Sequence, residues 1–202
     1  MAYPKNRAGY ANLCRLLTLG KRRAAKGKCE LSLSDVLEWG VDCVLVIDGS
    51  KQLAVTITQL KMHFSTDVFL GLAPQYDGYD AGYFQKLADI AVRHDIPITA
   101  LGHPIMHHGS RRRLADILSC IREKRTIDTL GHFAQPNAER RLKSEFEMRR
   151  LFKAFPEAIS NTVDIMDRAA FSLDELKYEY PCLLYTSPSP RDQRGSRMPS
   201  SA

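Results

Sequence analysis

The chain has 202 residues, of which 44% are hydrophobic and 26% are charged, as in an ordinary globular protein. A chain of this length can bury one hydrophobic core. No apolar run approaches the roughly 20 residues that span a bilayer, and the first ten residues contain no apolar stretch of the kind found in export signals. We therefore predict a cytoplasmic protein without a membrane partner.

The net charge and the cysteine content exclude few classes of function. The formal net charge is +6, which makes nucleic acid the first partner to consider. Residues 182–202 account for +2 of this charge, so the remaining excess is modest. The five cysteines form no CxxC pair, and they are predicted to be reduced and structural. Three of them, which lie among apolar neighbours, are predicted to act as small hydrophobic residues: Cys14, Cys43 and Cys120.

Helix and strand patterns alternate through the first half of the chain. Helical spacing of apolar residues and a serine cap (Ser32 or Ser34) predict helices over 8–23 and 35–39. Runs rich in Val, Ile and Leu predict strands over 41–47, 68–72 and 96–101. Helices are predicted between these strands, over 52–63 and 79–94. This alternation indicates an α/β fold with a parallel sheet and right-handed crossovers.

After Gly109 the pattern is helical throughout. Apolar periodicity predicts helices over 111–123, 146–155 and 157–169. Ser144 and Glu147 have the spacing of a capping box, and Pro156 suits the first position of the last helix.

Residues 182–202, CLLYTSPSPRDQRGSRMPSSA, continue neither a helical nor a strand period. One interpretation is a natural disordered linker. The segment also resembles a translated sequencing adapter, and we favour that interpretation. The segment is therefore predicted to be a non-native, disordered tail, and no function is assigned to it.

Four strings within residues 3–181 are similar to one protein family: NLCRLLTLGKRRAAKGK, CIREKRTID, NAERRLKS and FSLDELKYEYP. They resemble the error-prone DNA polymerases related to the alpha subunit of the bacterial replicase, the C family. The resemblance implies a partial PHP (polymerase and histidinol phosphatase) domain, a (β/α)-barrel-like fold, followed by an all-helical segment. Residues 1–125 would be a PHP domain without its N-terminal part, and residues 126–181 its helical end leading toward the palm.

The resemblance also implies a function for the parent protein. Members of the family copy damaged templates by translesion synthesis during damage-induced mutagenesis. Their palm carboxylates, which hold Mg²⁺, would lie beyond Pro181, so no catalytic residue is expected in this chain. The implied partners are DNA, the palm domain of the same chain, mutagenesis accessory proteins and the sliding clamp.

A histidine-rich stretch, LGHPIMHH (101–108), follows the third predicted strand, where PHP domains hold metal ions. His103 occupies the position of a family Asp, and His107 matches a family His. Ile105 stands where metal-binding relatives have a further His. A neutral imidazole in place of a carboxylate weakens a multi-metal site, so His103 and His107 are predicted to form at most a degenerate Zn²⁺ or Mn²⁺ site. The alternative is that His103 caps a strand while His107 and His108 lie in a solvated loop.

Basic residues are the second candidate site. Lys21, Arg22 and Arg23 could contact DNA phosphates, although no aromatic residue is interleaved with them, and a solvated helix end is the alternative. The charged residues of NAERRLKS (137–144) are interpreted as helix-surface and packing residues, with no evident nucleophile or acid–base pair. Two further functions stay open: a stand-alone metal-dependent phosphoesterase, and a non-catalytic module that binds DNA or protein.

Overall fold

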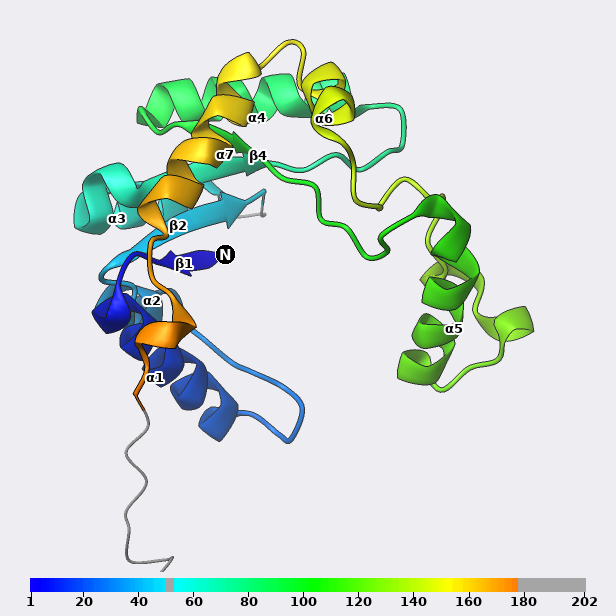
Figure 1. Cartoon of the computed structure of the whole chain (residues 1–202), viewed down its shortest axis with the longest axis horizontal. Coiled ribbons are helices and arrows are strands. Elements are labelled where there is room, and N and C mark those ends of the chain that lie inside the picture. The colour runs from blue at the N-terminus through cyan, green and yellow to red at the C-terminus, as the bar shows by residue number, and fades with distance from the viewer. Residues whose placement is uncertain (50–52, 178–202) are drawn as a thin grey trace, which may run out of the picture. The chain divides into compact units, whose positions relative to one another are not determined.

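A four-stranded sheet with strand order β1-β2-β3-β4 organises the first 171 residues (Figure 1). The computed structural model describes residues 1–49 and 53–177. The strands are β1 (Ala2–Pro4), β2 (Cys43–Asp48), β3 (Val68–Leu72) and β4 (Ile98–Ala100). β2, β3 and β4 run parallel, with Leu45 opposite Val68 and Leu70 opposite Ile98. The predicted parallel sheet is therefore confirmed.

β1 is a strand that the sequence did not reveal. It pairs antiparallel with β2, with Ala2 opposite Leu45 and Pro4 opposite Cys43. Three residues are too few to show a strand period, and proline, which lacks an N–H, is tolerated only at an edge such as this one. The sheet formed by the described residues is open rather than closed into a barrel.

In the described part of the chain, seven α-helices match the predicted helices to within a few residues. They are α1 (Arg7–Arg23), α2 (Leu33–Trp39), α3 (Leu53–Phe64), α4 (Asp80–His94), α5 (Arg112–Glu123), α6 (Glu145–Leu151) and α7 (Pro156–Arg168). Short 3₁₀ helices span 65–67, 109–111, 127–129, 131–133 and, in a separate unit that begins at Ser172, 173–175.

Capping explains where several helices begin. Ser32 caps α2 and Ser144 caps α6, each in a capping box, and Pro156 is the first residue of α7. α6 ends at Leu151, earlier than the predicted residue 155. The residue before a proline is disfavoured in helical conformation, and Phe155 accordingly has φ −137° and ψ 61°.

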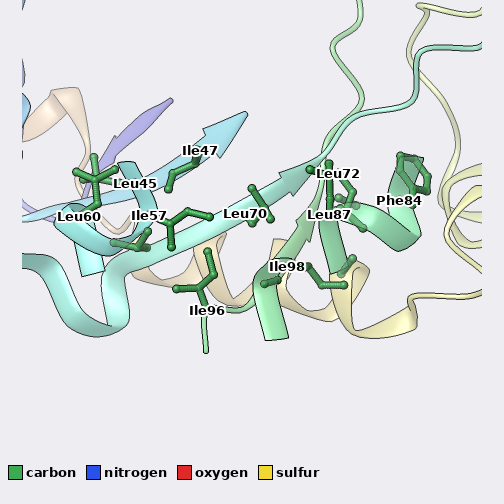
Figure 2. Close-up of a cluster of buried hydrophobic side chains, with 14 of the residues drawn as sticks. Leu45, Ile47, Ile57, Leu60, Leu70, Leu72, Phe84, Leu87, Ile96 and Ile98 are labelled. Carbon is green, nitrogen blue, oxygen red and sulfur yellow. The ribbon is translucent and has the colours of Figure 1, made fainter. Parts of the chain in front are cut away.

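The main hydrophobic core lies on one face of the sheet (Figure 2). Leu45, Leu70 and Ile98 project from three strands toward apolar residues of α3 and α4, such as Ile57 and Leu87. Phe152 and Ala158 close this core from the segments around α6 and α7. Burying these side chains is the main stabilising contribution of the fold.

α7 lies along β4 and reaches the other face of the sheet. The Asn161 amide donates a hydrogen bond to the Ile98 carbonyl (2.8 Å), so a helix occupies the β4 edge. Ile165 packs with Val44 and Val46 in a smaller core. An apolar pocket of about 450 Å³ opens beside Ile165, so this face is only partly covered by the described residues.

Four cysteines are free thiols in the described residues. Cys43 and Cys120 are buried, as predicted, whereas Cys14 and Cys29 are exposed, so the apolar environment predicted for Cys14 was wrong.

The predicted tail, 182–202, lies outside the described residues. No helix in the described part of the chain has the length and apolar character needed to cross a membrane.

Candidate functional site at the carboxyl ends of the parallel strands

A polar cavity of about 280 Å³ lies where the parallel strands end. Parallel strands bring their carboxyl ends to the same edge of a sheet, and ligand sites of α/β folds form there. Asp48 ends β2, while His103 follows β4. The rest of the lining comes from the residues after β3 and from the irregular segment before α6: Ala73, Pro74, Gln75, Gln135, Pro136 and Arg140.

Asp48 and His103 are the titratable pair of this cavity. His103 Nε2 lies 3.4 Å from Asp48 Oδ2, an ion-pair distance, but it makes no hydrogen bond. The Asp48 side chain is 52% exposed, so solvent reaches the pair. His103 has φ 41°, an uncommon conformation for a residue other than glycine. Arg140 Nε donates to the His103 carbonyl (3.1 Å) and helps to hold this conformation.

The structure does not gather the predicted histidines around one ion. His107 is exposed and is not part of the cavity lining. His108 uses Nδ1 to accept a hydrogen bond from the Ser110 backbone N–H, and so caps the 3₁₀ helix at 109–111. Within residues 1–49 and 53–177, no three His, Cys, Asp or Glu side chains are grouped to hold a metal. Asp48 and His103 supply two ligands, one short of a catalytic zinc site, and so do not fit one.

The 137–144 segment contributes Arg140 to the cavity lining, and it is not the helix surface that its charges suggested. The segment is irregular and pairs with the histidine-rich stretch. The backbone N–H of Ile105 donates to Arg140 O (2.9 Å), and that of Leu142 donates to Met106 O (3.1 Å). A string typical of the family therefore fixes the position of the segment that contains His103.

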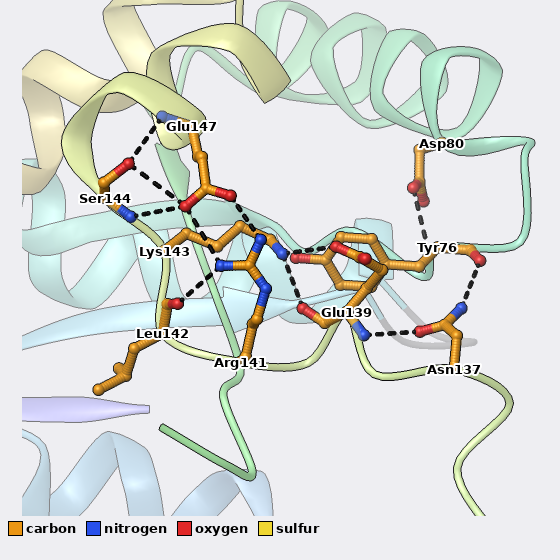
Figure 3. Close-up of polar contacts among 9 residues, drawn as sticks. All are labelled: Tyr76, Asp80, Asn137, Glu139, Arg141, Leu142, Lys143, Ser144 and Glu147. Atoms are coloured by element: carbon orange, nitrogen blue, oxygen red, sulfur yellow. Dashed lines mark hydrogen bonds and ion pairs between the residues drawn. The ribbon is translucent and has the colours of Figure 1, made fainter. Parts of the chain in front are cut away.

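Lys143 and Tyr76 connect this segment to the residues after β3 (Figure 3). The Lys143 side chain is only 4% exposed; its ammonium lies 4.8 Å from the centre of the Tyr76 ring and 2.9 Å from a Glu139 carboxylate oxygen. The Asn137 amide donates to the Tyr76 carbonyl (3.0 Å), and the Tyr76 N–H donates to Asp80 (3.1 Å). This contact could not be predicted from the sequence, because Tyr76 lies far from Lys143 along the chain.

Glu147 ends the same network at the start of α6. Its carboxylate forms an ion pair with Arg141 and accepts a hydrogen bond from the Ser144 N–H (3.1 Å), completing the capping box. The hydrogen bond from Arg141, followed by that from Ser144, lowers the pKa of Glu147 to about 2. Hydrogen bonds that favour the charged carboxylate have this effect.

We expect Glu147 to contribute to acid denaturation. Because its folded-state pKa lies below its unfolded-state value, its stabilising effect is complete above roughly pH 4.5 and is lost as the pH falls toward about 2. Glu147→Gln should lower the free energy of unfolding at pH 7 and leave it unchanged near pH 2, because glutamine keeps the cap but not the charge. Urea denaturation at several pH values checks this, with the exposed Glu145→Gln as control. An equal loss for Glu147→Gln at both ends of the pH range would contradict it.

The basic residues at the end of α1 divide into two groups. Arg23 Nη1 lies 2.6 Å from Asp35 Oδ2, and this hydrogen bond, with those from Ser32, lowers the pKa of Asp35 to about 2. Arg23 therefore holds α1 against α2. Lys21 and Arg22 are exposed. Trp39, an aromatic residue from outside the basic stretch, lines a pocket with Arg22, so the structure supplies the aromatic partner that the linear sequence did not show.

Several curated proteins are similar to this chain over nearly its whole length. The error-prone DNA polymerase of Ruegeria pomeroyi is 46% identical over 187 residues, and error-prone DNA polymerase 1 of Rhizobium meliloti is 44% identical over 187 residues. The chain is homologous to a segment of error-prone DNA polymerases. The error-prone DNA polymerase of Rhodopseudomonas palustris is 43% identical over 186 residues.

These alignments cover 90% of the chain but only 17% of the length of each relative. No protein-family model matches the chain. The predicted resemblance to error-prone DNA polymerases is thus confirmed, and the matched relatives are far longer than the matched segment.

Proposed function

We propose that this chain is part of an error-prone, DNA-directed DNA polymerase that copies damaged templates by translesion synthesis during induced mutagenesis. The observation that supports this most directly is the 46% identity to an error-prone DNA polymerase over 187 residues. The chain itself contributes no polymerase active site in this proposal. The Mg²⁺ ions of the reaction would be held by carboxylates of the palm domain.

Within that polymerase, residues 1–125 form part of a PHP domain, and residues 126–181 form its helical end toward the palm. The parallel strands, with a polar cavity at their carboxyl ends, support this assignment. The cavity contains Asp48 and His103 but, among the residues that the structure describes, no third metal-binding side chain beside them, and we assign it a structural rather than a hydrolytic role. Zn²⁺ or Mn²⁺ binding there is at most adventitious.

The region acts as a scaffold that docks on the palm. The partly covered sheet face beside Ile165 supports this role. So does the apolar face of α5, on which four side chains are exposed: Leu114, Ile117, Leu118 and Ile121. Monomeric proteins rarely expose apolar side chains grouped on one helix face. DNA, accessory mutagenesis proteins and the sliding clamp complete the proposed partners of the whole polymerase, which works in the cytoplasm.

A segment exchange tests the proposal. Residues 1–177 replace the aligned segment of the Ruegeria pomeroyi polymerase, and primer extension past an abasic site is measured with Mg²⁺. We expect the chimera to extend primers, and we expect the 202-residue chain alone not to.

A second chimera with Asp48→Asn and His103→Gln serves as the matched variant, because it removes the strand-end pair without large changes in shape. It should extend primers as well as the first chimera. A folded chimera that cannot extend, or loss of the chemical step in the second chimera alone, would contradict the proposal.

A further inference from the structure

A pocket of about 440 Å³ lies on α1 and α2 and contains none of the strand-end residues. Four of its lining residues, Arg15, Thr18, Leu19 and Arg22, have the i, i+3, i+4, i+7 spacing of one helix face. Trp39, the last residue of α2, lines it as well. The pocket thus combines cationic side chains with the single tryptophan of the chain.

The three arginines that line this pocket make different contacts. Arg23 is paired with the buried Asp35 and orients α2. The Arg15 guanidinium lies 5.6 Å from the centre of the Trp39 ring, a cation–π arrangement. Arg22 is exposed, and in the described part of the chain no carboxylate lies within ion-pair distance of it. Arg22 is therefore available to an external anion.

The surroundings of the pocket are strongly basic. The first 29 residues contain eight Lys or Arg and no Asp or Glu. Lys21, Lys26 and Lys28 are exposed near the end of α1. The acidic residues nearest to the pocket in sequence are Glu30, Asp35, Glu38 and Asp42. Arg23 neutralises Asp35, and Glu30 and Glu38 are exposed. Such a cluster of like charge attracts a polyanion.

We propose that this pocket binds single-stranded DNA, with one base stacked at Trp39 and Arg15 and an adjacent phosphate paired with Arg22. Stacking on aromatic and guanidinium groups is the common mode of single-strand binding, and the bases of a duplex cannot reach such a pocket. An acidic peptide would use the cations but not the indole ring. The choice of DNA over RNA rests on the proposed polymerase function; the stacking site itself does not.

Fluorescence of Trp39 tests the proposal directly, since no other tryptophan contributes to the emission of the full chain. Adding an oligothymidylate about twelve nucleotides long should quench this emission. Arg22→Gln should weaken binding and reduce the slope of log affinity against log salt by roughly 0.7, the value for one lost contact to a single strand. The matched control is Arg93→Gln, which removes an exposed cation from the last turn of α4 and should change neither quantity.

Trp39→Ala, followed by anisotropy of a fluorescein-labelled oligonucleotide, should weaken binding roughly 5- to 150-fold, the range for loss of one stacked base. Trp39→Phe keeps a smaller ring and should lose less, which separates stacking from a folding defect. Three results would contradict the proposed single-strand site. They are equally tight binding of a duplex, displacement of the oligonucleotide by polyglutamate at matched charge, and a loss of affinity in Arg93→Gln equal to that in Arg22→Gln. Primer extension by the chimera is measured independently of oligonucleotide binding to this chain. The polymerase proposal and the single-strand binding proposal can therefore fail separately.

Discussion

Phe152→Ala should destabilise the chain by about 3–5 kcal/mol, the range measured for removing a fully buried aromatic side chain. Phe152 has 0% exposure and stacks on Phe84, with ring centres 5.2 Å apart and an angle of 12° between the ring planes. Phe155 contacts Phe84 edge-on from the same turn (6.3 Å). Removing the Phe152 ring therefore opens a cavity between α4 and the residues that link α6 to α7. Urea denaturation followed by circular dichroism measures the loss.

Phe146→Ala is the matched control for this prediction. Phe146 lies in α6, six positions before Phe152, but it is 76% exposed. Replacing its side chain with alanine should therefore change the free energy of unfolding by less than about 0.5 kcal/mol. Equal effects of the two substitutions would mean that the α6–α7 segment does not pack on the sheet as described. The packing of Phe152 in the core beside the sheet would then be described wrongly.

Local signals in the sequence were enough to find most helices. The Ser144 and Glu147 pair, the proline at 156 and the spacing of apolar residues in α4 each depend on residues a few positions apart. The buried strands β2 and β3 were equally visible, since all but the last residue of β2 and all of β3 are buried, as in a sheet covered on both faces. Such features are encoded locally.

The features that the sequence did not reveal depend on contacts between distant segments. β1 is too short to show a period and exists because β2 offers it an edge. Trp39 approaches Arg15 because the Arg23–Asp35 pair holds α2 against α1. Lys143 is buried only because Tyr76 and Glu139 surround it. In the candidate site, His103 was predicted from the family resemblance and from its place after a strand, whereas Asp48 and Arg140 required the fold.

Gly9→Ala should also destabilise the chain strongly, because α1 touches the backbone before β2 at this residue. A Cβ at Gly9 would lie 2.2 Å from the Asp42 carbonyl oxygen and 2.9 Å from its carbon, and backbone atoms cannot move aside cheaply. Overpacking costs about 1–3 kcal/mol, while alanine regains up to about 1 kcal/mol of helix propensity. We expect a net loss of about 1–2 kcal/mol in urea denaturation, because the clash is with backbone and its cost lies in the upper part of that range. Because α1 also forms the basic pocket, the emission of Trp39 should shift as well.

Gly82→Ala is the same chemical change, but we expect it to raise the free energy of unfolding. Gly82 lies in α4, and apart from the adjacent residues and the nearby backbone of the helix itself, no atom lies within 4 Å of the Cβ that alanine would add. Alanine then only restricts the unfolded chain and favours the helix, so stability should rise by about 0.4–1 kcal/mol. Opposite signs for the two substitutions would show that contact with Asp42, rather than helix propensity, determines the effect at Gly9. A neutral or stabilising Gly9→Ala would mean that α1 does not lie against the start of β2, and the pocket between α1 and α2 would lose its structural basis.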